Sequence, residues 1–247
     1  MRLLVYNIRY GAGTGGGFHF PIPFMGYLRN TSANLGRITE FIKGYEPDIV
    51  GLIEVDSGSF RSGRSNQAER IADALDHFHV YQGKYGSHSF VGRLPLFNKQ
   101  VNAFLTSNEI RTPRFHYFRE GIKRLVIELE LNDLTVFLVH LSLKFRHRHH
   151  QLRDLYTLVK GARRPVIVAG DFNPLWGDTE MELFLAATGL RNANARGIPS
   201  FPSWMPHRQL DFVLHSPAIR VNRFEVPHIT LSDHLPLVCD FDVERKP

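Results

Sequence analysis

Carboxylate, amide and imidazole side chains recur where short apolar runs of the sequence end. The run VGLIE ends on Glu54, FLVH ends on His140, and VIVAGD ends on Asp171. Burying such polar groups without partners costs roughly 2–7 kcal/mol each, so a cluster of them is typical of a site that binds ions or moves protons. The full set is Glu54, His140, Asp171, Asn173, Asp211, Asp233 and His234.

Each of these residues, taken alone, also has a purely structural explanation. Glu54 is compatible with an ordinary ion pair, and His140 with a hydrogen-bonded histidine of the core. Their joint occurrence at the ends of successive apolar runs favours a single site over a set of unrelated structural groups.

Seven runs of β-branched and apolar residues that end at turn residues predict buried strands. They cover residues 2–8, 48–55, 125–131, 135–141, 165–169, 210–214 and 235–241. Four further segments carry apolar residues at helical spacing and predict helices. These are 35–42, preceded by capping residues at 31–34, and then 67–75, 151–159 and 179–187.

The order of these elements favours one fold class. Residues 78–142 are typical mostly of strand and loop, so strands and helices do not alternate strictly. Such an order indicates two packed sheets with helices outside them, in preference to a doubly wound parallel sheet. Because no repeat or low-complexity linker interrupts the chain, we expect one domain over residues 1–247.

Six motifs follow one another along nearly the whole chain, from residue 6 to residue 237. They are YNIR (6–9), GLIEVD (51–56), VHLSL (139–143), GDFN (170–173), LDFVL (210–214) and SDHLPL (232–237). In this order they resemble the endonuclease/exonuclease/phosphatase superfamily of DNase I-like phosphoesterases, and GDFN followed by SDH is the most specific part. The resemblance implies a four-layer α/β sandwich, with two packed mixed β-sheets flanked by helices.

The resemblance also implies a divalent metal site. Glu54 matches the main carboxylate ligand of Mg²⁺ or Mn²⁺, and Asn7 and Asp233 match the other positions that line this site. Oxygen ligands suit a hard cation that keeps several waters and also binds substrate phosphate. Asp171 resembles the residue that orients or deprotonates water, and Asn173 a donor to the phosphoryl oxygens.

Two histidines and an arginine complete the implied site. His234 matches the catalytic histidine, and Asp211 the carboxylate that orients it and favours its charged form. His140 matches a second histidine that many abasic-site endonucleases lack, which argues against that branch. Arg9, the last residue of the YNIR motif, lies next to the site in the resemblance and is a candidate for binding substrate phosphate. Whether Asp171 or His234 takes the water's proton, and whether one metal or two are bound, stays open.

The predicted activity is metal-dependent hydrolysis of a phosphodiester, of the endonuclease or exonuclease type. The partner is a phosphate-bearing substrate, and the net charge of +6 favours nucleic acid. An alternative is a phospholipid or sphingolipid phosphodiesterase that uses the aromatic loop 18–25 in peripheral contact with a membrane. An inositol or sugar phosphate phosphatase is another. A non-enzymatic binding protein is disfavoured, because every matched catalytic position holds the expected residue.

Other features of the sequence carry less functional information. The N-terminal apolar stretch is too short for a secretory signal, and Cys239 lies in an apolar run with no second cysteine, so we expect a cytoplasmic protein. The glycines at 11–17 match no nucleotide-binding pattern. The basic run 145–150 is interpreted as a solvated helix face, and Trp176 and Trp204 as core or rim residues. The sequence does not indicate an oligomeric state.

Overall fold

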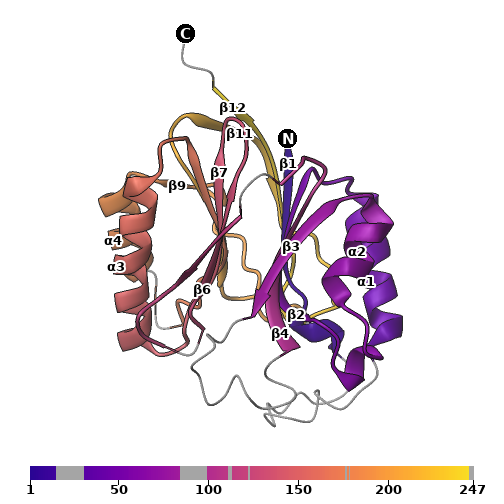
Figure 1. Cartoon of the computed structure of the whole chain (residues 1–247). Helices are drawn as coiled ribbons and strands as arrows, with labels where there is room; N and C mark the ends of the chain where they lie inside the picture. The colour runs from indigo at the N-terminus through magenta and orange to yellow at the C-terminus, as the bar shows by residue number, and fades with distance from the viewer. Residues whose placement is uncertain are drawn as a thin grey trace.

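Two β-sheets pack face to face, and helices cover the outer side of each sheet (Figure 1). The structure is a computed structural model that describes residues 1–14, 31–83, 99–110, 113–121, 123–175, 177 and 179–244. The aromatic loop 18–25 and Trp176, which were considered above, lie outside the described residues. The four-layer α/β sandwich expected from the sequence is confirmed.

The first sheet has six strands in the order β11-β12-β1-β2-β4-β3. Its central pair, β1 and β2, is parallel, whereas β12 runs antiparallel to β1 and β4 antiparallel to β2. The strands are β1 (Arg2–Asn7), β2 (Ile49–Asp56), β3 (Phe78–Gly83), β4 (Gln100–Thr106), β11 (Ile219–Glu225) and β12 (Leu237–Val243).

The second sheet also has six strands, in the order β5-β6-β7-β8-β10-β9. Here β7 and β8 form the parallel pair, and β10 runs antiparallel to β8. The strands are β5 (Arg114–Tyr117), β6 (Leu125–Glu130), β7 (Thr135–His140), β8 (Val166–Asp171), β9 (Arg191–Asn192) and β10 (Asp211–His215). The parallel pairs of both sheets therefore bring their carboxyl ends to an edge of the sandwich.

The alternation of side chains along each strand builds separate hydrophobic layers. In β1, Leu3 and Val5 face the second sheet and pack in one cluster with Ile127 and Leu138, whereas Leu4 belongs to the cluster beneath the helices. A third cluster lies between the second sheet and its own helices. Each buried aliphatic side chain contributes about 1.5–3 kcal/mol, so these layers hold the strand ends in fixed positions.

Among the described residues, helices cover the outer face of each sheet (Figure 1). On the first sheet lie α1 (Ser32–Gly44) and α2 (Gln67–Leu75), and on the second lie α3 (Phe145–Gly161) and α4 (Thr179–Thr188). Within the part of the chain that the structure describes, no helix is long and apolar enough to span a bilayer.

The start of α3 differs from the prediction. The helix begins at Phe145 instead of residue 151, and its N-cap, Lys144, makes no side-chain capping bond that would mark the boundary in the sequence. The basic run is therefore the beginning of the helix. Arg146 and His149 are exposed as expected, but Arg148 is fully buried and pairs with Glu180 of α4, so the solvated-face interpretation was wrong for this residue.

All seven predicted strands are present, and their ends shift by at most two residues. The strand β11 was not predicted, because charged and polar residues interrupt its apolar positions. It is an edge strand that pairs only with β12 among the described strands, so much of it faces solvent. Edge strands often carry charge, which discourages pairing with other chains but also hides their pattern in a sequence.

Candidate active site

Strand register brings three of the predicted residues side by side. His140 ends β7 and is paired with Asp171, which ends β8, and Asp171 is in turn paired with Asp211 at the start of β10. Each of these side chains is almost fully buried. The pairing therefore concentrates two carboxylates and an imidazole at one point of the second sheet, although up to 71 positions of sequence separate them (211 minus 140).

A glycine permits the close approach of these strands. Gly170 has a φ of +140°, and a Cβ at this position would lie 2.0 Å from the carbonyl oxygen of Val139. A side chain cannot be placed there without moving the strand that carries His140. The glycine of the GDFN motif is thus required by backbone packing next to Asp171.

Glu54 is directed into the site by an irregularity in β2. The register of β2 on β4 shifts between Leu52 and Val55, and Glu54 has a φ of +57°. Its backbone N–H donates to Asn102 Oδ1 at 3.3 Å instead of continuing the ladder. Bulges of this kind often re-aim a side chain beside an active site. The carboxylate of Glu54 comes within 4.0 Å of His140 Nε2, from the opposite sheet.

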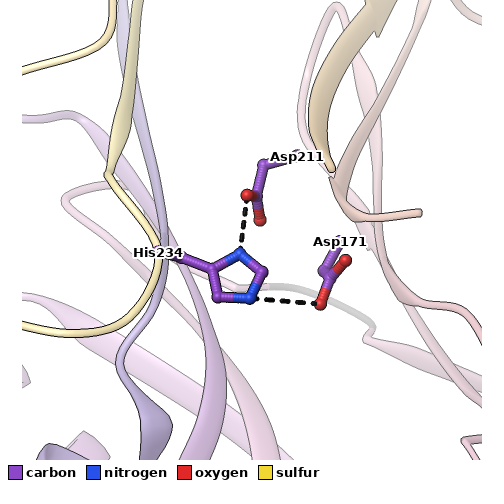
Figure 2. A group of neighbouring side chains, drawn as sticks. All are labelled: Asp171, Asp211 and His234. Carbon is purple, nitrogen blue, oxygen red and sulfur yellow. Dashed lines mark hydrogen bonds and ion pairs between the residues drawn. The ribbon is translucent and has the colours of Figure 1, made fainter. Parts of the chain in front are cut away.

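Asp211, His234 and Asp171 form the centre of the site (Figure 2). His234 lies in the loop before β12, and its Nδ1 is 2.7 Å from Asp211 Oδ2. Its other ring nitrogen, Nε2, faces Asp171 Oδ2 at 4.0 Å. Ser200 Oγ donates to Asp211 at 2.7 Å, and the ring of Phe201 packs against the imidazole with centroids 4.9 Å apart. The imidazole is thereby fixed on both nitrogens and on one face.

The charges of this group reinforce one another. Burial alone would lower the pKa of His234, but the carboxylates of Asp211 and Asp171 outweigh it and raise that pKa to about 10. Burial opposes ionisation of Asp171 as well, yet the hydrogen bond to His140 and the charge of His234 hold its pKa below the usual range. Burial raises the pKa of Asp211. At neutral pH the centre therefore contains an imidazolium beside the Asp171 carboxylate.

His140 contacts the same carboxylate oxygen of Asp171 that His234 faces. The Nε2 atom of His140 is 3.2 Å from Asp171 Oδ2, so the Asp171 carboxylate meets one imidazole from the end of β7 and one from the loop before β12. The same nitrogen is in contact with Nζ of Lys123, which the prediction from sequence did not include. A lysine shortly before a strand carries no distinguishing pattern, and only the fold shows that it reaches the site.

Asn7, Arg9 and Asp233 line the adjoining rim. Asn7 Nδ2 donates to Asp171 Oδ2 at 3.3 Å, and its Oδ1 accepts from the backbone N–H of Arg9 at 3.2 Å. The guanidinium Nε of Arg9 lies 3.5 Å from Asp233 Oδ2. Arg9 and Tyr10 have φ values of +44° and +57°, and backbone strain of this kind clusters at functional sites. Asp233 therefore joins the site through Arg9.

Asn173 is held tightly beneath this group. Its backbone N–H donates to Asp171 Oδ1 at 3.1 Å, and its Nδ2 donates to the carbonyl of Leu141 at 3.0 Å. Its φ of +55° closes the turn after β8. One hydrogen of the Asn173 side-chain amide is bound to the carbonyl of Leu141. The predicted hydrogen bond from Asn173 to a phosphoryl oxygen would use the second hydrogen, and it stays a prediction.

The donor set fits a divalent cation. Among the described residues, Asp171, Asp211 and His234 offer ligand atoms that all lie within 4.8 Å of one another. His234 is protonated and already paired with Asp211, however, and an imidazolium does not ligate a metal. Glu54, Asn7 and Asp171 instead carry side-chain oxygen atoms close to His140 or to one another, and oxygen ligands suit Mg²⁺ or Mn²⁺. The predicted set of Asn7, Glu54 and Asp233 stays a prediction.

One class of phosphoesterases combines a sandwich of two sheets with acidic and histidine side chains clustered at one edge. This chain has both features. The chain belongs to the endonuclease/exonuclease/phosphatase family, whose sequence profile matches residues 4–234. The family resemblance drawn from the six motifs is therefore confirmed. No curated protein matches the chain significantly.

Solved structures of three proteins share the fold at low sequence identity. A conserved protein of unknown function from Enterococcus faecalis matches with 13% identity and a TM-score of 0.75, over 99% of this chain and 100% of its own. The human Nocturnin catalytic domain, with bound sulfate, matches with 21% identity and a TM-score of 0.69, over 98% and 94%. A mannosyl-6-phosphatase from Bacteroides thetaiotaomicron matches with 15% identity and a TM-score of 0.70, over 98% and 99%.

Proposed function

We propose that this protein is a divalent-metal-dependent phosphodiester hydrolase of the endonuclease or exonuclease type. The arrangement of Asp171 between His140 and His234, with His234 paired to Asp211, carries the proposal. A phosphodiester anion repels a nucleophilic water, so its hydrolysis needs fixed positive charge and a proton acceptor in one place. This group supplies both.

Protonation decides the role of each residue. His234 is already an imidazolium at neutral pH, so it cannot accept the proton of the attacking water. The Asp171 carboxylate lies against both imidazoles, and from this position we assign it to orient this water and take its proton. His234 then stabilises the negative charge that develops on the phosphoryl group and supports departure of the leaving group. Asp211 keeps His234 charged and correctly oriented.

Glu54, Asn7 and Asp233 would hold Mg²⁺ or Mn²⁺. When bound, the cation supplies further neutralisation of the phosphoryl oxygens and favours ionisation of the water. The Arg9 guanidinium lies on the same rim and would bind a substrate phosphate, at the cost of loosening its ion pair with Asp233.

Nucleic acid is the favoured substrate. The chain has a net charge of +6, and exposed Lys144 and Arg146 stand a few residues after His140, where β7 leads into α3. Cations beside a catalytic site attract a polyanionic backbone. They would contact phosphates on either side of the bond that is cut.

A lipid phosphodiesterase is the second candidate, and a different observation favours it. Leu143 and Phe145 alternate with these cations and are 51% and 57% exposed. Apolar side chains interleaved with basic ones suit the surface of an acidic membrane. The lipid reading therefore competes with nucleic acid for the same rim.

A metal-dependent screen tests the proposal. The substrates are plasmid DNA, RNA, bis-p-nitrophenyl phosphate, phospholipid vesicles and inositol or sugar phosphates, each with Mg²⁺, Mn²⁺ or EDTA. We expect hydrolysis of diesters that EDTA abolishes and that His234→Ala removes. Hydrolysis of monoesters alone would replace the proposal with a phosphatase, and no hydrolysis of any substrate would refute the enzymatic assignment.

The role of Glu54 has its own measurement. Glu54→Ala should raise the Mg²⁺ concentration for half-maximal activity by more than about tenfold, since loss even of an outer partner of a metal ligand costs this much. Glu40→Ala removes the same charge from an exposed position of α1 and serves as the matched control. Equal metal dependence in the two variants would exclude Glu54 as a ligand.

A further inference from the structure

Lys123 reaches the candidate active site from outside the six sequence motifs. It lies in the connection between β5 and β6, shortly before Leu125, and its side chain is half-buried. Its Nζ is in contact with Nε2 of His140, and its charge contributes to the low pKa of Asp171. The charge of Lys123 therefore acts on His140 and Asp171, two of the proposed catalytic residues.

The Nε2 atom of His140 cannot form a hydrogen bond with both Asp171 and Lys123 at the same time. Asp171 Oδ2 lies 3.2 Å from Nε2 and requires a hydrogen on it, whereas Lys123 requires a lone pair there. The bond to the buried carboxylate is the stronger of the two, because an ionised acceptor roughly doubles the strength of a hydrogen bond. The three ammonium hydrogens of Lys123 are then available to another acceptor.

The position of Lys123 is fixed by a buried glutamine of α3. Gln151 Nε2 donates to the carbonyl oxygen of Lys123 at 2.7 Å and to that of Glu120 at 3.0 Å, while Gln151 Oε1 accepts from the backbone N–H of Ser142 at 2.8 Å. One side chain thus ties the β5–β6 connection to the turn that follows His140. Gly121 makes this approach possible, since a Cβ there would lie 2.4 Å from Ser142 Oγ.

The charges at the site leave a role for this cation. Arg9 faces Asp233 and His234 is bound to Asp211, so both are partly neutralised by carboxylates. Within the described parts of the chain, Lys123 forms no ion pair with a carboxylate: its Nζ contacts His140, and its charge acts on Asp171 without direct contact. A substrate phosphoryl group that approaches Asp171 would bring an anion into direct contact with Lys123.

We propose that Lys123 binds a non-bridging phosphoryl oxygen of the substrate and stabilises its charge during hydrolysis. The assignment rests on the proposed phosphodiesterase function and adds to it a substrate-binding residue on the His140 side. Because Lys is a compact point charge, it suits an oxygen that gains charge in the transition state. It therefore contributes more to kcat than to KM.

Kinetics of three variants on bis-p-nitrophenyl phosphate with Mg²⁺ test this assignment. Lys123→Met keeps the length of the side chain and removes its charge, Lys123→Arg keeps the charge, and Lys43→Met removes the same charge from an exposed position of α1. We expect Lys123→Met to lose about tenfold to a hundredfold in kcat/KM, mostly in kcat, as for loss of a hydrogen bond to a charged group. Lys123→Arg should recover most of this loss, and Lys43→Met should match the wild type.

Binding of orthophosphate, measured by calorimetry with Mg²⁺ present, separates this assignment from the proposed function. Weaker binding by Lys123→Met than by Lys43→Met supports the assignment even if no tested diester is hydrolysed. Equal binding by the two variants or no detectable binding by the wild type would overturn it, and so would equal activity of Lys123→Met and Lys43→Met on a diester that the wild type hydrolyses. Thermal unfolding of each variant shows whether a loss reflects the fold, and a loss in Lys123→Arg as large as in Lys123→Met would also overturn it.

Discussion

Two buried ion pairs lie in different layers of the molecule and do different work. His234–Asp211 lies at the edge where the sheets meet, with nitrogen and oxygen 2.7 Å apart. Arg148–Glu180 lies in the outer layer and joins α3 to α4, with a shortest distance of 2.5 Å. All four side chains are less than 10% exposed, at 8% and 3% in the first pair and 0% and 8% in the second.

The difference lies in what surrounds each pair. Arg148 also donates to the carbonyls of Ser142 and Leu143, so its hydrogens are directed to the backbone. Arginine side chains in general do not exchange protons in proteins. His234 faces a second carboxylate, Asp171, and can change its charge. A buried pair with an unchanging cation therefore fixes structure, whereas a pair with a titratable cation next to a further acid is suited to catalysis.

The largest expected effect is a loss of activity when the ion pair His234–Asp211 is broken. His234→Ala should reduce the hydrolysis of a phosphodiester by roughly 10³-fold, within the usual 10²–10⁴-fold range for a positioned acid or base. The measurement is kcat/KM with saturating Mg²⁺. His149→Ala, an exposed histidine of α3, is the control. A His234→Ala enzyme with nearly full activity would remove the histidine from the mechanism.

The second-largest expected effect is a loss of stability when the ion pair Arg148–Glu180 is broken. Glu180→Gln leaves Arg148 buried without a counter-charge and should lower the free energy of unfolding by about 3–5 kcal/mol. Urea unfolding at pH 7 measures this loss, and Glu182→Gln on the exposed face of α4 is the matched control. If Glu180→Gln lost activity without losing stability, the division between the two pairs would be wrong.

A pH titration tests the electrostatics of the catalytic pair. The folded-state pKa of His234 is raised to about 10, so the charged imidazole contributes stability that is complete below about pH 6.5, the ordinary pKa, and is lost as pH rises through about 10. In metal-free protein, NMR should place its titration near the higher value. Asp211→Asn should move the titration to lower pH. An unchanged midpoint would mean that Asp211 does not charge His234.

The smallest expected effect comes from the hydroxyl that supports Asp211. Ser200→Ala removes the 2.7 Å hydrogen bond to the carboxylate but leaves the ion pair in place. We expect a loss of about 1.5–3 kcal/mol in unfolding free energy, as for a hydrogen bond to a charged group, and less than about a tenfold loss of kcat/KM. A collapse of activity as deep as that of His234→Ala would show that the serine, and not only the pair, sets the geometry.

Much of the fold and of the site was predictable because it depends on local patterns. Apolar runs gave the central strands, and their terminal polar residues gave Glu54, His140 and Asp171. The edge strand β11 and the start of α3 were not predicted. In both, charged residues stand where an apolar pattern or a capping residue would have marked the element.

What the sequence determined by itself is the family, the layered architecture and the identity of the residues at the strand ends. Their types and order are local properties that the chain carries before it folds. Only the tertiary structure decided which of them touch, since sheet register sets Asp171 beside His140 and Asp211. It also decided that Lys123 meets His140 and that Arg148 is buried against Glu180. Such contacts depend on long-range packing, because the partners lie 17 and 32 positions apart in the sequence and no local pattern links them.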